Sequence, residues 1–180
     1  MKVVFNNIVL CSTMKNPNIK ATAAVAIIRC EQPMTSYLLL RRAAHPQDPW
    51  SGHFSFPGGK KDPVDRTLLD TCLRETREET GIKLEADQLI RTLKPEPAGH
   101  NFHHLIWVQP FLFSLSKKPQ IILDEIEIAN SSWISAKDFA TPSSHSDKEM
   151  IPGKIFPTFP LQDYYLWGFT YKLLFKIIEI

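Results

Sequence analysis

Three glutamates, Glu75, Glu78 and Glu79, lie within five positions of one short segment. On a helix of about 3.6 residues per turn, Glu75 lies one turn before the other two, so the three carboxylates share one surface. Like charges at these spacings repel by roughly 0.2 to 0.5 kcal/mol per pair, and the nearby helix C-terminus disfavours negative charge further. A segment that works against its own helix in this way indicates a site with a compensating ligand.

Carboxylate oxygens restrict the choice of that ligand. Because no Cys or His lies among them, they suit Mg²⁺ or Mn²⁺ better than zinc. The preceding turn, Pro57-Gly58-Gly59, has little side chain, so its backbone groups could approach a cation or a phosphate closely. The alternative is that Arg74 and Arg77 neutralise the glutamates and that the helix presents an ordinary solvated face.

A helix from roughly Arg66 to Thr80 must position these carboxylates. Asp65 is its expected N-cap, and Gly81 is the residue that turns the chain out at its C-terminus. The glutamates are expected to project away from the stripe that faces a sheet. That stripe comprises Leu69, Leu73, Thr76 and Thr80.

Apolar and β-branched runs predict the strands around this helix. They lie at residues 21–30, 37–40, 89–93, 104–115 and 126–134, with Pro33 separating the first two into a hairpin. We expect a short helical turn at 136–139, a surface loop at 141–153 and an amphipathic helix at 163–178. These elements predict an α/β fold in which a mixed sheet carries helices on its two sides.

Length and composition favour one soluble domain over residues 1–180, with residues 1–20 as a loosely attached lead-in. The 180 residues are 43% hydrophobic and 22% charged, and the net charge of +2 comes without a basic run, so no nucleic-acid partner is expected. Cys11, Cys30 and Cys72 are widely spaced, which favours reduced thiols in a cytoplasmic protein. The longest apolar runs fall short of about 18 residues, so neither secretion nor membrane spanning is expected.

The stretch from Arg74 to Ile82, RETREETGI, resembles the end of the Nudix box, with Thr76 where an apolar residue is usual. The resemblance implies a Nudix-type α/β/α sandwich with a catalytic loop-helix motif, over a core of about 22–178. It also implies metal-dependent hydrolysis of a pyrophosphate bond in a nucleoside diphosphate conjugate. Carried over, Glu75 and Glu79 are the principal metal ligands and Glu78 is a ligand or a water-orienting partner. Arg74 holds the carboxylates, and the Gly59 carbonyl completes the coordination.

The front half of the box departs from the general pattern. Five residues separate Gly59 from Asp65 and eight more precede Arg74, so the glutamate that usually braces the arginine has no counterpart at the usual spacing. Asp65 fits an N-cap better than a ligand. This spacing, together with Phe56-Pro57-Gly58-Gly59 and Leu39-Leu40-Arg41-Arg42, is similar to the coenzyme A pyrophosphatase branch. The strict signature of that branch has a second arginine and a histidine where this chain has Pro46-Gln47-Asp48-Pro49-Trp50.

The resemblance makes coenzyme A or a derivative the first substrate candidate. ADP-ribose, NADH or another nucleotide conjugate is the alternative, as is a non-catalytic nucleotide-binding module. Arg41, Arg42 and Glu125 are weaker substrate candidates. Glu75 is the first choice for the base that activates water, and Glu125 and Glu127 compete with it or are ordinary solvated charges.

Two further predictions concern a cluster of three histidines and two aromatic residues near the C-terminus. His100, His103 and His104 are not expected to bind a metal, because on a strand His103 and His104 point to opposite sides; contact with substrate is the alternative. Trp167 and Phe169 are expected in the core or at the seam of a homodimer rather than as a platform for a nucleobase.

Overall fold

The structure is a computed structural model that describes residues 20–46, 48, 50–99 and 105–178. One sheet contains β1 (Ala23–Gln32), β2 (Ser36–Arg42), β3 (Phe54–Ser55), β4 (Gly58–Lys60), β5 (Leu89–Thr92), β6 (Glu96–Ala98), β7 (Ile106–Lys117) and β8 (Ile128–Ser135). A second sheet contains β9 (Ser146–Ile151), β10 (Lys154–Leu161) and β11 (Tyr164–Leu166). The α-helices are α1 (Leu68–Thr80), α2 (Ala136–Phe139) and α3 (Gly168–Ile178), and two 3-10 turns span Ala86–Gln88 and Pro142–Ser144.

The larger sheet is mixed, as predicted. Its central strand β1 runs parallel to β7 and antiparallel to β2 and β4. The order along the sheet is β3-β2-β1-β7-β5, with β8 paired to β2 and β6 paired to β7. Because β1 is covered on both faces, its sequence is a continuous apolar run rather than an alternating one.

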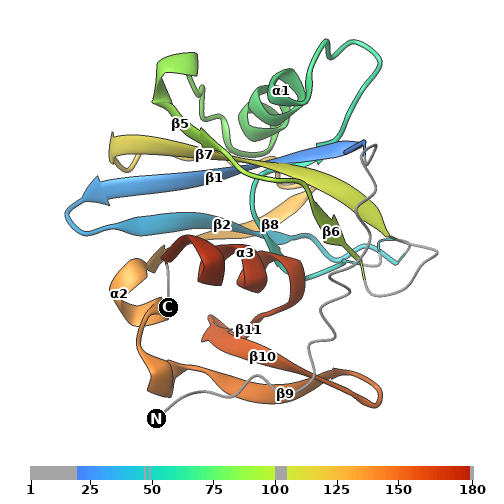
Figure 1. Ribbon diagram of the computed structural model, residues 1–180, viewed down its shortest axis with the longest axis vertical. Coiled ribbons are helices and arrows are strands. Elements are labelled where there is room, and N and C mark those ends of the chain that lie inside the picture. The colour runs from blue at the N-terminus through green and yellow to red at the C-terminus, as the bar shows by residue number, and fades with distance from the viewer. Residues whose placement is uncertain (1–19, 47, 49, 100–104, 179–180) are drawn as a thin grey trace.

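Successive residues of the central strands enter two separate cores, one on each face of the sheet. Ile28 packs in the core that contains Cys72 of α1, whereas its neighbour Ile27 packs with Tyr171 and Leu174 of α3. Figure 1 shows α1 above the sheet and α3 below it. The molecule is therefore an α/β/α sandwich with a mixed sheet, as the sequence predicted.

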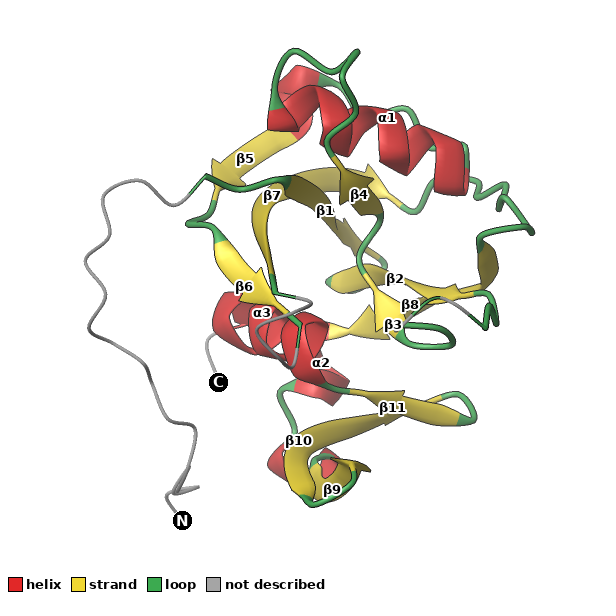
Figure 2. Cartoon of the chain, turned by 90° about the vertical axis from the view of Figure 1, so that its right-hand side faces the viewer, coloured by secondary structure: helices red, strands yellow, loops and turns green. Residues whose placement is uncertain are grey.

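The C-terminal third differs from the prediction. Residues 141–153 are not a surface loop, because they contain a 3-10 turn and strand β9, which pairs with β10. The helix expected over 163–178 begins only at Gly168, after strand β11. Strand β9 is largely exposed, so it lacks the apolar alternation by which a strand is predicted. Figure 2 shows this smaller sheet lying apart from the larger one.

Several expectations fall in part outside the described residues. Only Lys20 of the expected lead-in is described, and His100, His103 and His104 are not. Cys30 and Cys72 are buried free thiols. No helix in the described part of the chain is long and apolar enough to cross a membrane.

Candidate active site

Helix α1 begins at Leu68, two residues later than predicted, and Thr67 rather than Asp65 is its N-cap. The Thr67 hydroxyl accepts a hydrogen bond from the Asp70 backbone N–H at 3.1 Å, and the Asp70 carboxylate accepts one from the Thr67 N–H at 2.8 Å. This reciprocal pair satisfies two N–H groups that would otherwise lack partners. At the other end, Gly81 takes a left-handed φ of 70° and closes the helix, as predicted.

Asp65 instead binds Arg74. Its carboxylate accepts hydrogen bonds from Arg74 Nε at 3.0 Å and Nη2 at 2.9 Å, and also from the Thr71 hydroxyl at 2.9 Å. The hydrogen bonds from Arg74 outweigh burial and hold the pKa of Asp65 well below its ordinary value. The arginine is therefore braced by an aspartate at a different spacing from that of the general box.

The remaining terminal nitrogen of Arg74 contacts two of the three glutamates. Nη1 lies 3.0 Å from Glu75 Oε1 and 2.8 Å from Glu78 Oε2. The side chain of Glu78 is 58% exposed, whereas that of Glu75 is 17% exposed. Burial raises the pKa of Glu75, and the charge of Arg74 opposes that rise. For Glu78, the structure therefore fits the alternative in which Arg74 neutralises the carboxylate on a solvent-exposed face of the helix.

Glu79 points toward the sheet, so the prediction that all three glutamates project away from it is wrong. The residue is only 2% exposed, and its Oε2 accepts a hydrogen bond from the Gly58 N–H at 2.8 Å. Burial, together with repulsion from Glu75, raises the pKa of Glu79 to about 8, although the bond from Gly58 opposes this. The buried positions of the helix are Thr71, Cys72, Thr76, Glu79 and Thr80, while Leu69 and Leu73 are only partly buried.

Thr76, where the Nudix box usually has an apolar residue, is fully buried in α1. Its hydroxyl donates a hydrogen bond to the Cys72 carbonyl oxygen at 2.7 Å. The helix itself therefore satisfies the buried polar group, which makes the substitution acceptable at this position.

The two glycines before the helix form strand β4 rather than a free turn. Gly58 pairs with Val25 and Gly59 with Ala24 on β1. A Cβ atom at Gly58 would lie 2.1 Å from the Ala24 carbonyl oxygen, and one at Gly59 would lie 2.6 Å from the Glu75 carboxylate. The absence of side chains thus lets this strand lie directly against β1 on one side and the glutamates of α1 on the other.

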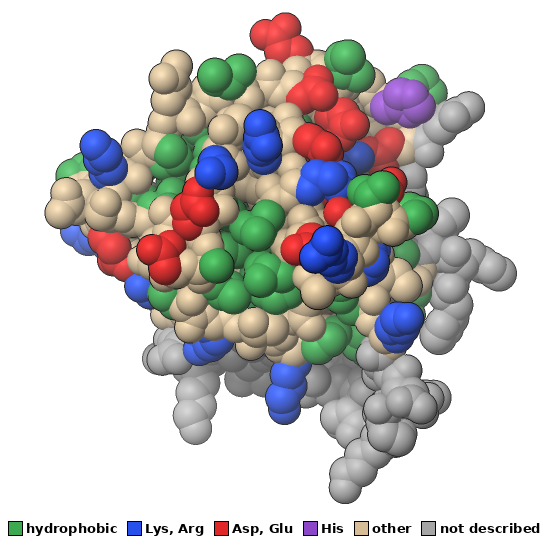
Figure 3. Space-filling model, turned by 90° about the horizontal axis from the view of Figure 1, so that it is seen from above, with side chains coloured by type: hydrophobic (Ala, Val, Ile, Leu, Met, Phe, Trp, Pro, Cys, Tyr) green, Lys and Arg blue, Asp and Glu red, His purple; other side chains and the backbone are tan. Residues whose placement is uncertain are grey.

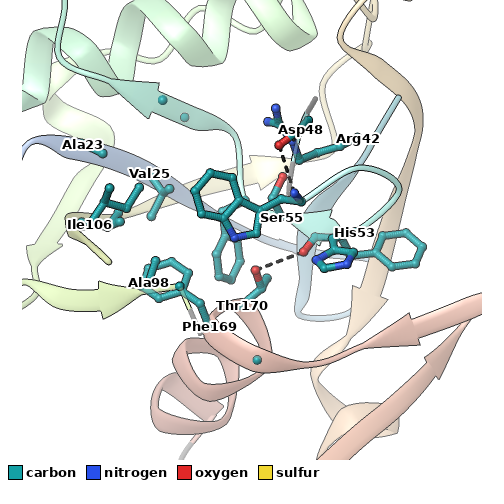
Figure 4. Close-up of a pocket in the computed structure, with 18 of the residues that line it drawn as sticks. Ala23, Val25, Arg42, Asp48, His53, Ser55, Ala98, Ile106, Phe169 and Thr170 are labelled. Atoms are coloured by element: carbon teal, nitrogen blue, oxygen red, sulfur yellow. Dashed lines mark hydrogen bonds and ion pairs between the residues drawn. The ribbon is translucent and has the colours of Figure 1, made fainter. Parts of the chain in front are cut away.

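A cleft of about 1400 Å³ opens between α1 and the start of α3. Its polar lining includes Glu75, Glu79, Glu127, Arg42 and Lys60, and its apolar lining includes Ile106, Met150, Phe156, Trp167 and Phe169. Figure 4 shows Val25 and Ile106 on one side, Arg42 and Asp48 on another, and Phe169 and Thr170 at the start of α3. Trp167 and Phe169, which the sequence offered as core or dimer seam, thus line this cleft.

The loop before β8 brings a further carboxylate, that of Glu127, to the cleft that Glu75 and Glu79 line. Backbone N–H groups of Ile122 and Asp124 donate to the carbonyl oxygens of Thr80 at 2.9 Å and of Glu79 at 3.2 Å. These bonds satisfy carbonyls that the end of a helix leaves without partners. Glu127 then lines the cleft, and its charge contributes to the raised pKa of Glu79. Glu125 is not among the described residues that line it.

The two neighbouring arginines of β2, between which the strand is bulged, have different surroundings. Arg42 pairs with Asp48 and lines both the large cleft and the smaller pocket that Arg41 lines. Arg41 lines this smaller pocket of about 310 Å³, pairs with Asp163 and lies 5.4 Å from the ring centre of Tyr164. Of the two, the structure places only Arg42 beside the carboxylates.

In the described ranges, no group of three or more His, Cys, Asp or Glu side chains is arranged to hold a metal ion. Two observations nevertheless fit a divalent cation. Glu79 is a buried carboxylate with a single hydrogen bond and a raised pKa, and Glu75 carries a second negative charge beside it. Gly59 leaves the Glu75 carboxylate room that a Cβ atom would fill. A cation would compensate this concentration of charge.

The surface above α1 carries charges of both signs. Figure 3, which views the molecule from this side, shows acidic and basic side chains next to one another. Helix α1 carries one pair of opposite charges, Arg74–Glu78, and a second pair, Lys83–Glu85, follows the helix.

Fold and site together define an α/β/α protein that presents buried carboxylates on a strand-loop-helix unit beside a large cleft. The NUDIX domain family model matches residues 20–154 of the chain. The chain belongs to the Nudix family.

Two curated relatives illustrate this similarity. A Schizosaccharomyces pombe protein, named Uncharacterized protein C14C4.10c, is 30% identical over 138 residues, which are 71% of this chain. The chain spans only 42% of the length of that protein. Uncharacterized Nudix hydrolase NudL of Yersinia pestis is 27% identical over 154 residues, which cover 84% of this chain and 75% of NudL.

Solved structures share the fold. A MutT/nudix family protein from Enterococcus faecalis superposes with a TM-score of 0.61 at 17% identity, covering 93% of this chain and 64% of that one. The Ap4A hydrolase of C. elegans, in a binary complex, superposes with a TM-score of 0.52 at 23% identity, covering 66% of this chain and 82% of that one.

Proposed function

We propose that the chain hydrolyses the pyrophosphate bond of a nucleoside diphosphate conjugate, with coenzyme A or one of its derivatives as the first candidate substrate. The observation that carries the proposal is the buried Glu79, which Gly58 holds at 2.8 Å on the wall of the cleft beside Glu75. A buried carboxylate beside a second, partly buried one is costly unless a cation or a proton compensates the charge.

Glu75 and Glu79 would hold the divalent cation, with Glu78 and the Gly59 carbonyl as further ligands. Once bound, the cation would neutralise phosphate oxygens and lower the pKa of a bound water. Mg²⁺ and Mn²⁺ both suit these hard oxygen donors.

The surrounding side chains would activate the water, hold Glu75 in place and bind the phosphates. Water attacks one phosphorus of the pyrophosphate, and Glu75 accepts its proton, because burial makes this carboxylate more basic than usual. Glu127, on the same cleft, is the competing base. Arg74 fixes Glu75 through a 3.0 Å ion pair, and Arg42 binds phosphate oxygens. The products are two phosphomonoesters.

Two features support coenzyme A in particular. In this chain Phe56-Pro57-Gly58-Gly59 precedes the shifted box, and this loop resembles that of coenzyme A pyrophosphatases. The cleft also continues from the carboxylates to an apolar and aromatic wall that contains Ile106, Phe156 and Trp167. Such a wall suits the long, uncharged pantetheine arm of coenzyme A better than a second sugar phosphate.

A substrate panel tests the proposal. Coenzyme A, ADP-ribose, NADH, a dinucleoside polyphosphate and an oxidised dNTP are incubated with the protein and Mg²⁺ or Mn²⁺, and the phosphomonoester products are identified. Release of 3′,5′-ADP from coenzyme A at the highest kcat/KM is the expected result. Faster cleavage of ADP-ribose or NADH would replace coenzyme A as the substrate, and no turnover of any compound would contradict the proposed function.

A further inference from the structure

Arg42 is held along one edge of its guanidinium group. Its Nε donates a hydrogen bond to Asp48 Oδ2 at 2.8 Å, and both side chains are mostly buried. The described residues provide no partner for the two terminal nitrogens, Nη1 and Nη2. An arginine in this arrangement keeps a planar pair of donors that can bind two oxygens of one phosphate.

Asp48 is itself fixed by the backbone around it. Its second carboxylate oxygen, Oδ1, accepts a hydrogen bond from the Trp50 N–H at 3.0 Å, and its carbonyl oxygen accepts one from the Ser51 N–H at 3.0 Å. The carboxylate therefore has a defined position relative to β2, the strand that carries Arg42. Because the guanidinium group is planar, fixing Nε also fixes the direction in which the terminal nitrogens point.

Arg42 lines the large cleft and also borders the smaller pocket beside Arg41. Arg42, Asp48, Glu79 and Glu127 all line that cleft, and the positive charge of Arg42 acts on Glu79. Figure 4 shows the Arg42–Asp48 pair at the margin of the cleft. We propose that Asp48 is a positioning residue that directs the terminal nitrogens of Arg42 toward the pyrophosphate of the substrate. The inference rests on the proposed function and adds a determinant of substrate binding to it.

Because Asp48 is negatively charged, this role can be tested by whether KM rises or falls when the charge is removed. A carboxylate beside the cleft repels a polyanionic substrate and compensates the charge of Arg42. If Asp48 did nothing for substrate binding except contribute charge, its neutralisation would tighten binding and lower KM. If Asp48 orients Arg42, its neutralisation weakens binding although the cleft becomes more positive.

The experiment measures kcat and KM of the wild type and of Asp48→Asn with the best substrate of the panel. We expect KM to rise about tenfold, as for the loss of one hydrogen bond to a charged group, with kcat changed by less than about twofold. Asp48→Glu keeps the charge but moves the carboxylate by one methylene, and its KM is expected to rise as well. An unchanged or lower KM in Asp48→Asn would overturn the inference.

Repeating the Asp48 substitution in an Arg42→Lys protein separates two roles of Asp48, which are orientation of Arg42 and support of the surrounding backbone. In Arg42→Lys, which has a single charged nitrogen and no planar fork, adding Asp48→Asn should not raise KM further. An equal rise in both backgrounds would show that Asp48 acts through the Trp50 N–H alone, and would also overturn the inference.

Asp163→Asn is the matched control. It breaks the equivalent pair with Arg41 on the same strand, in the smaller pocket, and should leave KM unchanged. If the wild type turned over no compound of the panel, the proposed function would fail. Wild-type turnover without the expected rise in KM would count against the role of Asp48 alone.

Discussion

The carboxylate of Asp65 accepts both hydrogen bonds that Arg74 offers along one edge of its guanidinium group, from Nε at 3.0 Å and Nη2 at 2.9 Å. The remaining nitrogen, Nη1, contacts Glu75 at 3.0 Å and Glu78 at 2.8 Å. The geometry of Glu75 thus depends on a loop residue that precedes the helix.

Asp65→Asn should weaken both the fold and the activity. The substitution removes the charge and one acceptor from a buried pair, which costs about 1 to 3 kcal/mol of the free energy of unfolding. We expect turnover to fall about tenfold, because Arg74 then holds Glu75 less firmly. Urea unfolding and steady-state kinetics measure the two effects. Glu85→Gln, which removes the charge of the exposed pair with Lys83, is the control and should cost less than about 1 kcal/mol. Wild-type stability in Asp65→Asn would contradict this account.

Glu79→Gln and Glu78→Gln should differ in severity, since Glu79 is buried against Gly58 and Glu78 is largely exposed. We expect Glu79→Gln to lower metal-dependent turnover at least about 100-fold, because the cation loses a principal ligand. Glu78→Gln should lower it less. Initial rates over a range of Mg²⁺ concentrations measure both variants. Near-normal turnover in Glu79→Gln would refute the assignment of Glu79 as a ligand.

The metal-free protein should lose stability as the pH rises from about 4.5 to about 8. In this window the folded protein keeps a proton on Glu79, whose pKa is raised to about 8, while the unfolded chain has released it. The unfolded state therefore binds fewer protons than the folded state, and the free energy of unfolding falls with rising pH. We expect a fall of about 1 to 3 kcal/mol, measured by urea unfolding in the presence of EDTA.

The Glu79→Gln variant serves as the control for this pH dependence. It carries no titrating group at the position, so its free energy of unfolding in EDTA should be less dependent on pH than that of the wild type. At pH 8, Mg²⁺ should stabilise the wild type and have little effect on the variant. A pH profile shared by both proteins would assign the effect to other groups.

Gly58→Ala and Gly59→Ala should have different consequences. At Gly58, φ is 144° and a Cβ atom would meet backbone at 2.1 Å, so we expect a loss of about 3 kcal/mol in the free energy of unfolding. At Gly59 the Cβ atom would displace the Glu75 carboxylate, so activity should fall about tenfold with a smaller loss of stability. Gly153→Ala is the control, because φ is 75° there but nothing lies within 4 Å. Thermal unfolding and kinetics of the three variants check this.

Short-range sequence signals predicted much of the helix and its end. The spacing of Glu75, Glu78 and Glu79 and the position of Gly81 are local properties, and the helix ends at Gly81 as expected. Its beginning was predicted wrongly, because both Asp65 and Thr67 are good N-cap residues. Only the bidentate contact of Asp65 with Arg74 decides between them.

Short-range patterns also predicted several of the strands, and they failed where a strand depends on long-range pairing or is exposed. The apolar runs that became β1, β2, β7 and β8 were predicted because both their faces, or one of them, are buried. Strand β4 was missed because Gly58-Gly59 has low strand propensity. It forms a strand by pairing with β1, a contact with a distant segment of the chain. Strand β9 was missed because it is mostly exposed.

By itself, the sequence determined the mixed α/β architecture and the segment that carries the carboxylates, because helical periodicity, strand hydrophobicity and the RETREETGI motif are local patterns. Only the tertiary structure decided that Glu79 is buried, and that Glu127 and Arg42 reach the cleft while Glu125 and Arg41 do not. Burial and side-chain direction depend on contacts between segments far apart in the chain. The spacing of residues within one segment does not contain that information.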